Sequence, residues 1–326
     1  MMPQQRAKRQ RDITTLDEFY MMAKDVQRRS GQKINTAETE DRRFREFFGV
    51  GVHVAIITWT LLLQHGLLPD EAAVPHLLWT LYFLTCYPKQ EEGCAAAASK
   101  NGAIDPKTWR KYIWPMIYAL SDLESVVVSL IVLYLLVSID NLPLFQIIFE
   151  NRKFKPTHDT HMSVDCTDCY IRQKGPIFSS HKFKKKSALR YEVALCIGTG
   201  EIVWINGPFP AGEFNDITIF RECLQTALDD GERVEADDGY RGDPTITKVP
   251  ADVLTRIGEE EDAQQRRTQG RHETVNARLK NFKILVEQYR HDETQHGYVF
   301  RAVACLVQIA LKNGDPLYNV NYKVSF

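Results

Sequence analysis

The chain has 326 residues, of which 44% are hydrophobic and 25% charged, so its composition is that of an ordinary globular protein with room for about two domains. Its 41 Lys and Arg nearly cancel its 42 Asp and Glu, so the net charge gives no sign of a nucleic-acid partner, and any such sign must come from local clusters. Seven scattered cysteines, an odd number, argue against a secreted disulfide framework.

Residues 1–30 are predicted to form a basic, flexible tail that lacks the apolar run of a secretory signal. Four basic residues lie close together near its start: Arg6, Lys8, Arg9 and Arg11. Such a cluster is typical of a nuclear import signal, which would place the protein in the nucleus. A solvated tail has the same composition and stays open as the alternative.

Residues 31–150 are predicted to be helical. Charged, helix-forming segments alternate there with apolar ones, and Asp105 followed by Pro106 is a typical helix start. Pro115 should kink or restart that helix. Several short helices in a row are compatible with a helix-turn-helix-like DNA-binding domain, but a helical bundle without that function has the same pattern.

One segment of this half, residues 126–139, has the apolar composition of a membrane-spanning helix. This mostly apolar run of 14 residues falls short of the ~20 that cross a bilayer, and Asp140 follows at once. We therefore expect no membrane partner, and instead a buried helix or a badly matched insertion.

From about residue 160 the hydrophobic pattern changes to that of β-strands. Three β-rich runs (161–171, 189–197 and 201–209) predict successive antiparallel strands. A helix beginning at Asn215 or Asp216, a short strand ending in two aspartates, a long helix beginning near Gly270 and a final helix follow. This order predicts an α/β domain, with helices packed on a mixed sheet.

Three acidic residues fall where the ends of these elements would meet: Asp165 in the first strand, Asp237 at the end of the fourth, and Glu273 in the first turn of the long helix. If the first and fourth strands are neighbours, Asp165 and Asp237 share one crevice at the strand ends. Converging carboxylates repel unless divalent metal neutralises them, and hard oxygen ligands favour Mg²⁺ or Mn²⁺. Two such ions would support phosphoryl transfer. The alternative is that each aspartate caps a helix or forms a turn.

The Cys166-x-x-Cys169 pair lies beside Asp165 and invites a zinc or redox interpretation. In a strand its two members face opposite sides of the sheet, and no second cysteine pair accompanies them. Asp168 is likewise expected on the face opposite to Asp165, as a polar or turn position.

Two clusters of basic residues flank the acidic positions and suit a polyanion such as DNA. The predicted contacts come from the run at 181–190 and from the long helix, and they are Lys182, Lys184, Lys185, Lys186, Arg266, Arg267, Arg271 and Lys280. A solvated helix face and a plain loop are the alternatives.

Four blocks together resemble the PIF/Harbinger-type DDE transposases: "SVDCTD" (163–168), the segment 191–221, "ADDGYRG" (236–242) and "RHETVNARLKNF" (271–282). They occur in the order of that family, and 35 residues separate Asp237 from Glu273, the spacing associated with it. The resemblance covers about half of the chain, from roughly 160 to 320.

The resemblance implies a ribonuclease H-like DDE endonuclease domain, which we expect at 158–322, and cut-and-paste transfer of DNA ends with two divalent metals. By motif, Asp165, Asp237 and Glu273 match the catalytic and metal-binding triad, with Asp237 chosen over Asp238. Asp216 matches a further acidic position and is interpreted as a helix cap that supports the site. Expected partners are DNA, a separate Myb-like DNA-binding protein and further copies of the chain.

Two departures from the family stand out. Cys166 occupies a place where many relatives carry glycine, and residues 125–147 interrupt the helical half, which suggests a retained intron. Two other functions stay open: a domesticated, catalytically silent DNA-binding or scaffold protein, and a metal-dependent nuclease without strand transfer.

Overall fold

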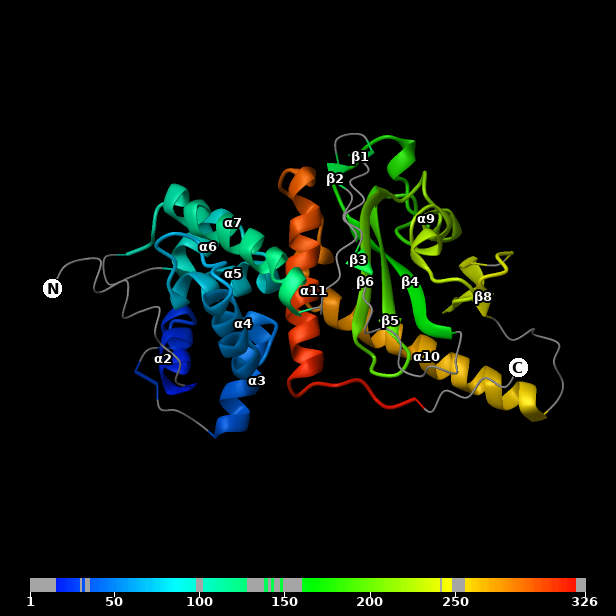
Figure 1. Ribbon diagram of the computed structural model, residues 1–326. Coiled ribbons are helices and arrows are strands. Elements are labelled where there is room, and N and C mark those ends of the chain that lie inside the picture. Colours follow the sequence, from blue (N-terminus) through cyan, green and yellow to red (C-terminus); the bar gives the residue numbers. More distant parts are fainter. Residues whose placement is uncertain are drawn as a thin grey trace. The chain divides into compact units, whose positions relative to one another are not determined.

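The computed structural model describes residues 16–29, 31–32, 36–97, 102–127, 138–139, 142–143, 147–148, 160–240, 242–247 and 256–320 (Figure 1). Its contacts divide the chain into two compact units. Unit 1 contains residues up to Val127 together with Leu279–Val286 and Tyr298–Asn313; unit 2 contains Val128–Arg278, Glu287–Gly297 and the segment from Gly314 onward.

Unit 1 is built of helices in the part that the structure describes. These are α2 (Leu16–Val26), α3 (Ala37–Phe48), α4 (Val52–Gln64), α5 (Val74–Cys86), α6 (Gln90–Ala96), α7 (Pro106–Asp122), α8 (Glu124–Val127) and most of α11 (His296–Lys312). Helix α5 is apolar around most of its circumference, as expected for a central helix. It packs against α2, α3 and α7.

The predicted flexible tail is wrong for its second half, because α2 occupies residues 16–26. This helix buries Phe19, Tyr20 and Val26 on one face, and that burial offsets the entropy of ordering the segment. The Arg6–Arg11 cluster lies outside the described residues.

Helix α7 begins as predicted, with the Asp105 carboxylate accepting hydrogen bonds from the backbone N–H groups of Lys107 and Thr108. It runs through Pro115 as one element, so the predicted restart did not occur. Most of the 125–147 segment lies outside the described residues.

Membrane-spanning helices were sought only in the described ranges, where no single helix is long and apolar enough. The pair α3 and α4, bent by 60°, meets the criterion together by length and composition alone.

Unit 2 contains a six-stranded mixed sheet with the order β3-β6-β5-β4-β7-β8. The strands are β3 (Ile147–Ile148), β4 (Thr160–Tyr170), β5 (Ala188–Cys196), β6 (Ile202–Pro210), β7 (Arg233–Ala236) and β8 (Ile246–Thr247). A separate two-stranded pair joins β1 (Ser138–Ile139) to β2 (Leu142–Pro143). The predicted α/β class, a mixed sheet with flanking helices, is confirmed.

Strand β4 is the centre of this sheet. It pairs antiparallel with β5, which pairs antiparallel with β6, as the three β-rich runs predicted. On its other side β4 pairs parallel with β7, so the first and fourth predicted strands are neighbours.

Helix α10 (Arg256–Lys280) contacts one face of β4, and α9 (Asp216–Glu222) lies on the side of its opposite face. Ser163 hydrogen-bonds to His272 of α10, whereas Cys166 contacts Tyr240, whose ring packs on Phe220 of α9. Since neighbouring residues of a strand point to opposite faces, odd-numbered β4 side chains meet α10 and even-numbered ones lie on the α9 side.

The predicted start of the long helix near Gly270 is wrong, because α10 begins at Arg256 and ends at Lys280. Gly270 lies inside the helix although glycine is a poor helix former. A Cβ there would lie 2.7 Å from the Tyr318 hydroxyl, so glycine allows the C-terminal segment to approach the helix.

The predicted boundary between a helical first half and a single domain at 158–322 differs from the observed division. Residues 279–286 and most of α11 belong by their contacts to unit 1. Helix α11 buries side chains around most of its circumference. Within unit 1, Arg301 of this helix donates to the Ser121 hydroxyl and pairs with Glu124.

Candidate active site

Asp165 and Asp237 lie side by side at the carboxyl ends of the two parallel central strands. Val164 of β4 is paired with Ala236 of β7, and each aspartate is the next residue along its chain. The neighbouring ends of parallel strands are the usual place for a site in an open α/β sheet.

The Asp165 carboxylate is half-buried and held at both oxygens. Oδ1 accepts a 2.7 Å hydrogen bond from the Cys166 backbone N–H, and Oδ2 accepts a 3.1 Å bond from Nδ2 of Asn276. Burial raises the pKa of Asp165 to about 6. The nearby Lys182 lowers this pKa, while the charges of Asp237 and Asp216 raise it. Two further carboxylates are thus close enough to influence the ionisation of Asp165.

Asp237 and Asp216 approach each other around Gly239. The Gly239 N–H donates to Asp237 Oδ1 at 2.8 Å. A Cβ at Gly239 would lie 3.0 Å from Asp237 Oδ1 and 3.4 Å from Asp216 Oδ2. A side chain at position 239 would therefore crowd two carboxylates, which accounts for the glycine there. The side chain of Asp238 lies outside the described residues.

Glu273 is carried to the same end of the sheet by α10. One turn before it, Gln269 Nε2 donates to the Ala236 carbonyl at 3.4 Å, and three residues after it Asn276 holds Asp165. Residues 269, 273 and 276 share one helix face, so Glu273 belongs to the face that passes the ends of β7 and β4. Its side chain is exposed.

The donor chemistry at these positions fits a divalent cation, because carboxylate oxygens are the ligands that Mg²⁺ and Mn²⁺ prefer. Asp165 experiences the charges of Asp216 and Asp237. Within the described ranges, however, no three His, Cys, Asp or Glu side chains are grouped closely enough to hold a metal ion. The structure thus places the three aspartates within range of one another's charges and leaves Glu273 on the adjoining helix face.

Asp216 is not the predicted helix cap. Asn215 is the cap of α9, and its side chain accepts from the Thr218 N–H at 2.9 Å. Asp216 is the first helical residue and forms an ion pair with Arg190, whose Nη1 lies 2.7 Å from Oδ1. Its negative charge at the positive helix end is favourable.

Asp168 is not a turn position but a buried partner of an ion pair. It lies opposite Arg190 across β4 and β5 and is only 3% exposed. Arg190 donates to both carboxylate oxygens at 2.8 and 3.0 Å, and the Ser180 hydroxyl donates at 2.5 Å. Burial alone would raise the pKa of Asp168, but these hydrogen bonds lower it below its ordinary value.

Cys166 and Cys169 lie on opposite faces of β4, as the strand alternation predicted. The Cys166 thiol lies 3.3 Å from the Tyr240 hydroxyl under α9, and burial raises its pKa well above the usual range. A buried, protonated thiol is a poor metal ligand.

The predicted DNA-binding residues fall into two groups. Arg266 and Arg267 on α10, and Lys182, Lys184, Lys185 and Lys186 in the loop after β4, are exposed. Arg271 is buried, and its guanidinium donates to the carbonyls of Ile197 and Tyr318, so its prediction as a DNA contact is wrong. Lys280 donates to the Leu285 carbonyl, which ties down its ammonium.

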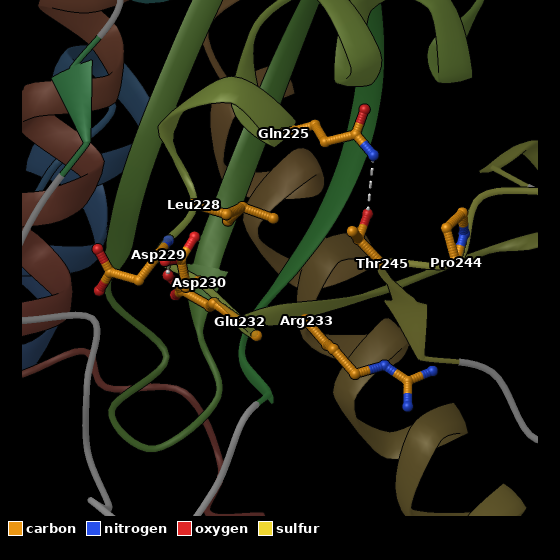
Figure 2. A pocket seen from close by; sticks show the side chains of 9 residues that line it. Gln225, Leu228, Asp229, Asp230, Glu232, Arg233, Pro244 and Thr245 are labelled. Carbon is orange, nitrogen blue, oxygen red and sulfur yellow. Dashed lines mark hydrogen bonds between the residues drawn. The ribbon is translucent and has the colours of Figure 1, made fainter.

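A pocket of about 480 Å³ lies at the other end of β7, where Arg233 begins that strand. Its lining includes Gln225, Asp229 and Thr245, and Figure 2 shows Gln225 hydrogen-bonded to Thr245. The candidate carboxylates do not line it, so it is not part of the site.

Two residues of the site were missed in the sequence. Asn276 follows Glu273 by three residues, a spacing that places both on one helix face. Arg190 is a lone cation in a strand of otherwise mostly apolar residues, and a buried cation requires a carboxylate partner.

No protein-family model matches the chain, and no curated protein or solved structure matches it.

Proposed function

We propose that unit 2 is a ribonuclease H-like DNA endonuclease domain with an Asp165-Asp237-Glu273 site, and that the protein is a DDE transposase. The observation that carries this proposal is the register of β4 and β7, which sets Asp165 beside Asp237. The face of α10 that contains Glu273 contacts both strand ends, through Gln269 and Asn276. Three carboxylates at one strand end, with exposed lysines nearby, suit metal-assisted chemistry on a polyanion.

Asp165, Asp237 and Glu273 would hold the metal. One or two Mg²⁺ or Mn²⁺ ions, when bound, supply charge stabilisation for the attacking and leaving oxygens of a phosphodiester. Around them Asn276 and the Cys166 N–H fix the orientation of the Asp165 carboxylate. Such fixed geometry lowers the reorganisation needed during reaction.

In the cutting step, a bond forms between a water oxygen and the phosphorus while the bond from phosphorus to the 3′ oxygen breaks. The water proton ends on the leaving oxygen, which gives a 3′-hydroxyl. In the joining step that hydroxyl attacks target DNA in the same way.

DNA ends and target DNA are the proposed substrates, reached by the exposed lysines of the 182–186 loop and by Arg266 and Arg267. A Myb-like protein and further copies of this chain are proposed partners, unit 1 is proposed as a helix-turn-helix-like DNA-binding module, and the nucleus is the proposed location.

Cleavage of plasmid DNA tests this function. We expect nicking that requires Mg²⁺ or Mn²⁺ and that falls by at least ~10²-fold in Asp165→Asn and Glu273→Gln, because each variant keeps the shape and removes a ligand charge. Asp230→Asn, an exposed acid at the other end of β7, is the matched control and should cut normally. Equal cutting by all four proteins would refute the assignment.

A silent scaffold is the second candidate, and one observation favours it. The described side chains do not form a ready group of three metal ligands. Wild-type protein that binds duplex DNA but neither cuts it nor binds Mn²⁺ would establish this alternative.

A further inference from the structure

The loop after β4 is a compact basic structure. A bridge between Ser179 and Ser187 closes it, and we call Ser180–Lys186 the basic loop. Backbone hydrogen bonds from Lys185 N to Ser180 O and from Ser180 N to Lys186 O hold its ends together. Lys184 and Lys185 have φ values of 52° and 67°, so the chain turns tightly at its tip.

The basic loop packs along one face of β4. Lys182 Nζ donates to the Cys166 carbonyl at 2.7 Å, the Ser180 hydroxyl donates to Asp168, and Phe183 packs against Tyr170. Residues 166, 168 and 170 alternate along the strand, so the side chains of Asp168 and Tyr170 share the α9 face. Three successive contacts therefore fix the position of the loop.

A buried chain of charges anchors this arrangement. Asp216 pairs with Arg190, Arg190 with Asp168, and Asp168 accepts from Ser180, whose oxygen also accepts from the Phe183 N–H. Asp168 and Arg190 are at most 7% exposed. Charge-assisted hydrogen bonds in such surroundings are strong and directional. The same Asp216 approaches Asp237, so the anchor joins the basic loop to the carboxylate site.

The loop brings one ammonium to the carboxylates. Lys182 Nζ lies 2.7 Å from the carbonyl oxygen of Cys166, the residue that follows Asp165 and whose N–H holds Asp165 Oδ1. Lys184 and Lys185 belong to the same exposed loop but lie at its tight turn. Lys182 thus differs from Lys184 and Lys185 in where its ammonium lies, although all three residues are lysines.

We propose that Lys182 is a catalytic residue that binds a non-bridging oxygen of the phosphate being cut, and that Ser180, Asp168 and Arg190 position it. This inference rests on the proposed function. A cation fixed beside the carboxylates stabilises the charge that develops on the phosphate in the transition state. Lys184 and Lys185 lie at the turn of the loop and contact the DNA backbone elsewhere, which contributes affinity only.

The test compares Lys182→Gln with the control Lys174→Gln, because both remove one exposed lysine charge from the segment after β4 and Lys174 has no place in the proposed site. We expect Lys182→Gln to lower kcat at saturating DNA by ~10²-fold, the usual cost of a lost transition-state donor. Mn²⁺ binding, measured by calorimetry without DNA, should stay equal or become tighter, since a nearby cation opposes metal. Lys174→Gln should keep the kcat of wild type, whereas Lys185→Gln should lower the salt slope of DNA binding by about 0.9.

Equal kcat in Lys182→Gln and Lys174→Gln would overturn the proposal, as would a loss of kcat in Lys182→Gln matched by an equal loss of Mn²⁺ affinity, since Lys182 would then act on the metal site and not on the phosphate. A footprint separates this outcome from failure of the proposed function. In Ca²⁺, a non-cleaving metal, bound duplex DNA should protect the Lys182 amine from acetylation even if the protein cuts no DNA. Protection of Lys184 and Lys185 without protection of Lys182 would refute the contact.

Discussion

The two faces of β4 show how one strand serves two purposes. On the α10 face, Ser163 and Asp165 meet His272 and Asn276, and Asp165 stays half-buried next to the exposed Asp237, while the exposed Glu273 lies on the adjoining helix. On the α9 face, the cross-strand partners of Cys166 and Asp168 are Glu192 and Arg190, which are almost completely buried. The first face is accessible to a ligand, and the second fixes the loop and strand that shape the first. Each of the following variants disturbs one face.

Arg190→Ala should have the largest effect, because it leaves Asp168 and Asp216 without their cation. Breaking a buried ion pair in this way costs ~3–5 kcal/mol of the free energy of unfolding. Urea denaturation followed by circular dichroism would measure it. Arg267→Ala, an exposed cation of α10, should change stability by less than ~0.5 kcal/mol. A small loss in Arg190→Ala would mean that the network does not anchor the α9 face.

Glu192 predicts a pH-dependent stability on the same face. Burial is the main cause that raises its pKa to about 8, although the Trp204 indole donates to Oε2 at 2.8 Å. Because this pKa lies above the unfolded value, the contribution of Glu192 is complete below about pH 4.5 and is lost as the pH rises toward 8.

We therefore expect the stability of Glu192→Gln relative to wild type to increase between pH 5 and pH 8, by up to ~1.4 kcal/mol per pH unit. Chemical denaturation at four pH values would measure this slope. Glutamine keeps the acceptor for Trp204, so packing is matched. A difference that does not change with pH would show that Glu192 is ionised in the folded protein.

Asn276→Ala tests the α10 face. Removing the amide that holds Asp165 Oδ2 should weaken Mn²⁺ binding by ~10- to 100-fold, the usual cost of losing a group that orients a ligand. The free energy of unfolding should change little, because the bond is only half-buried. Ala277→Ser, an exposed neighbour on α10, is the control. Unchanged Mn²⁺ affinity in Asn276→Ala would remove Asn276 from the site.

The contrast between the two faces also explains which features of the fold and of the site could be predicted from the sequence. Alternation along 160–170 correctly separated Cys166 from Cys169, and the strand order paired β4 with β7. These features follow from local periodicity and short connections. The role of Asp168 could not be predicted in this way. Strand register and loop geometry bring its partners Arg190 and Ser180 to it, and local sequence periodicity does not specify either.

The same reason explains the errors on α10 and the basic residues. The low helix propensity of Gly270 predicts a helix boundary, but the Tyr318 hydroxyl occupies the space of its missing side chain and the helix continues through it. Arg271 has the composition of a DNA contact, yet it donates to two backbone carbonyls in the core. Tertiary contacts decided both positions.

Cys166→Ala should have the smallest effect, because it removes one side-chain contact from the α9 face and leaves the backbone contact with Asp165 intact. The thiol contacts the Tyr240 hydroxyl on the α9 face, so its loss leaves a buried donor unpaired and costs ~1–2 kcal/mol of stability. The Cys166 backbone N–H, which holds Asp165 Oδ1, is retained by alanine. DNA nicking and Mn²⁺ affinity should therefore match wild type, and Cys166→Ser should recover much of the stability because its hydroxyl can bond to Tyr240. A loss of nicking in Cys166→Ala at full stability would mean that the side chains of the α9 face take part in the chemistry and do not merely support it.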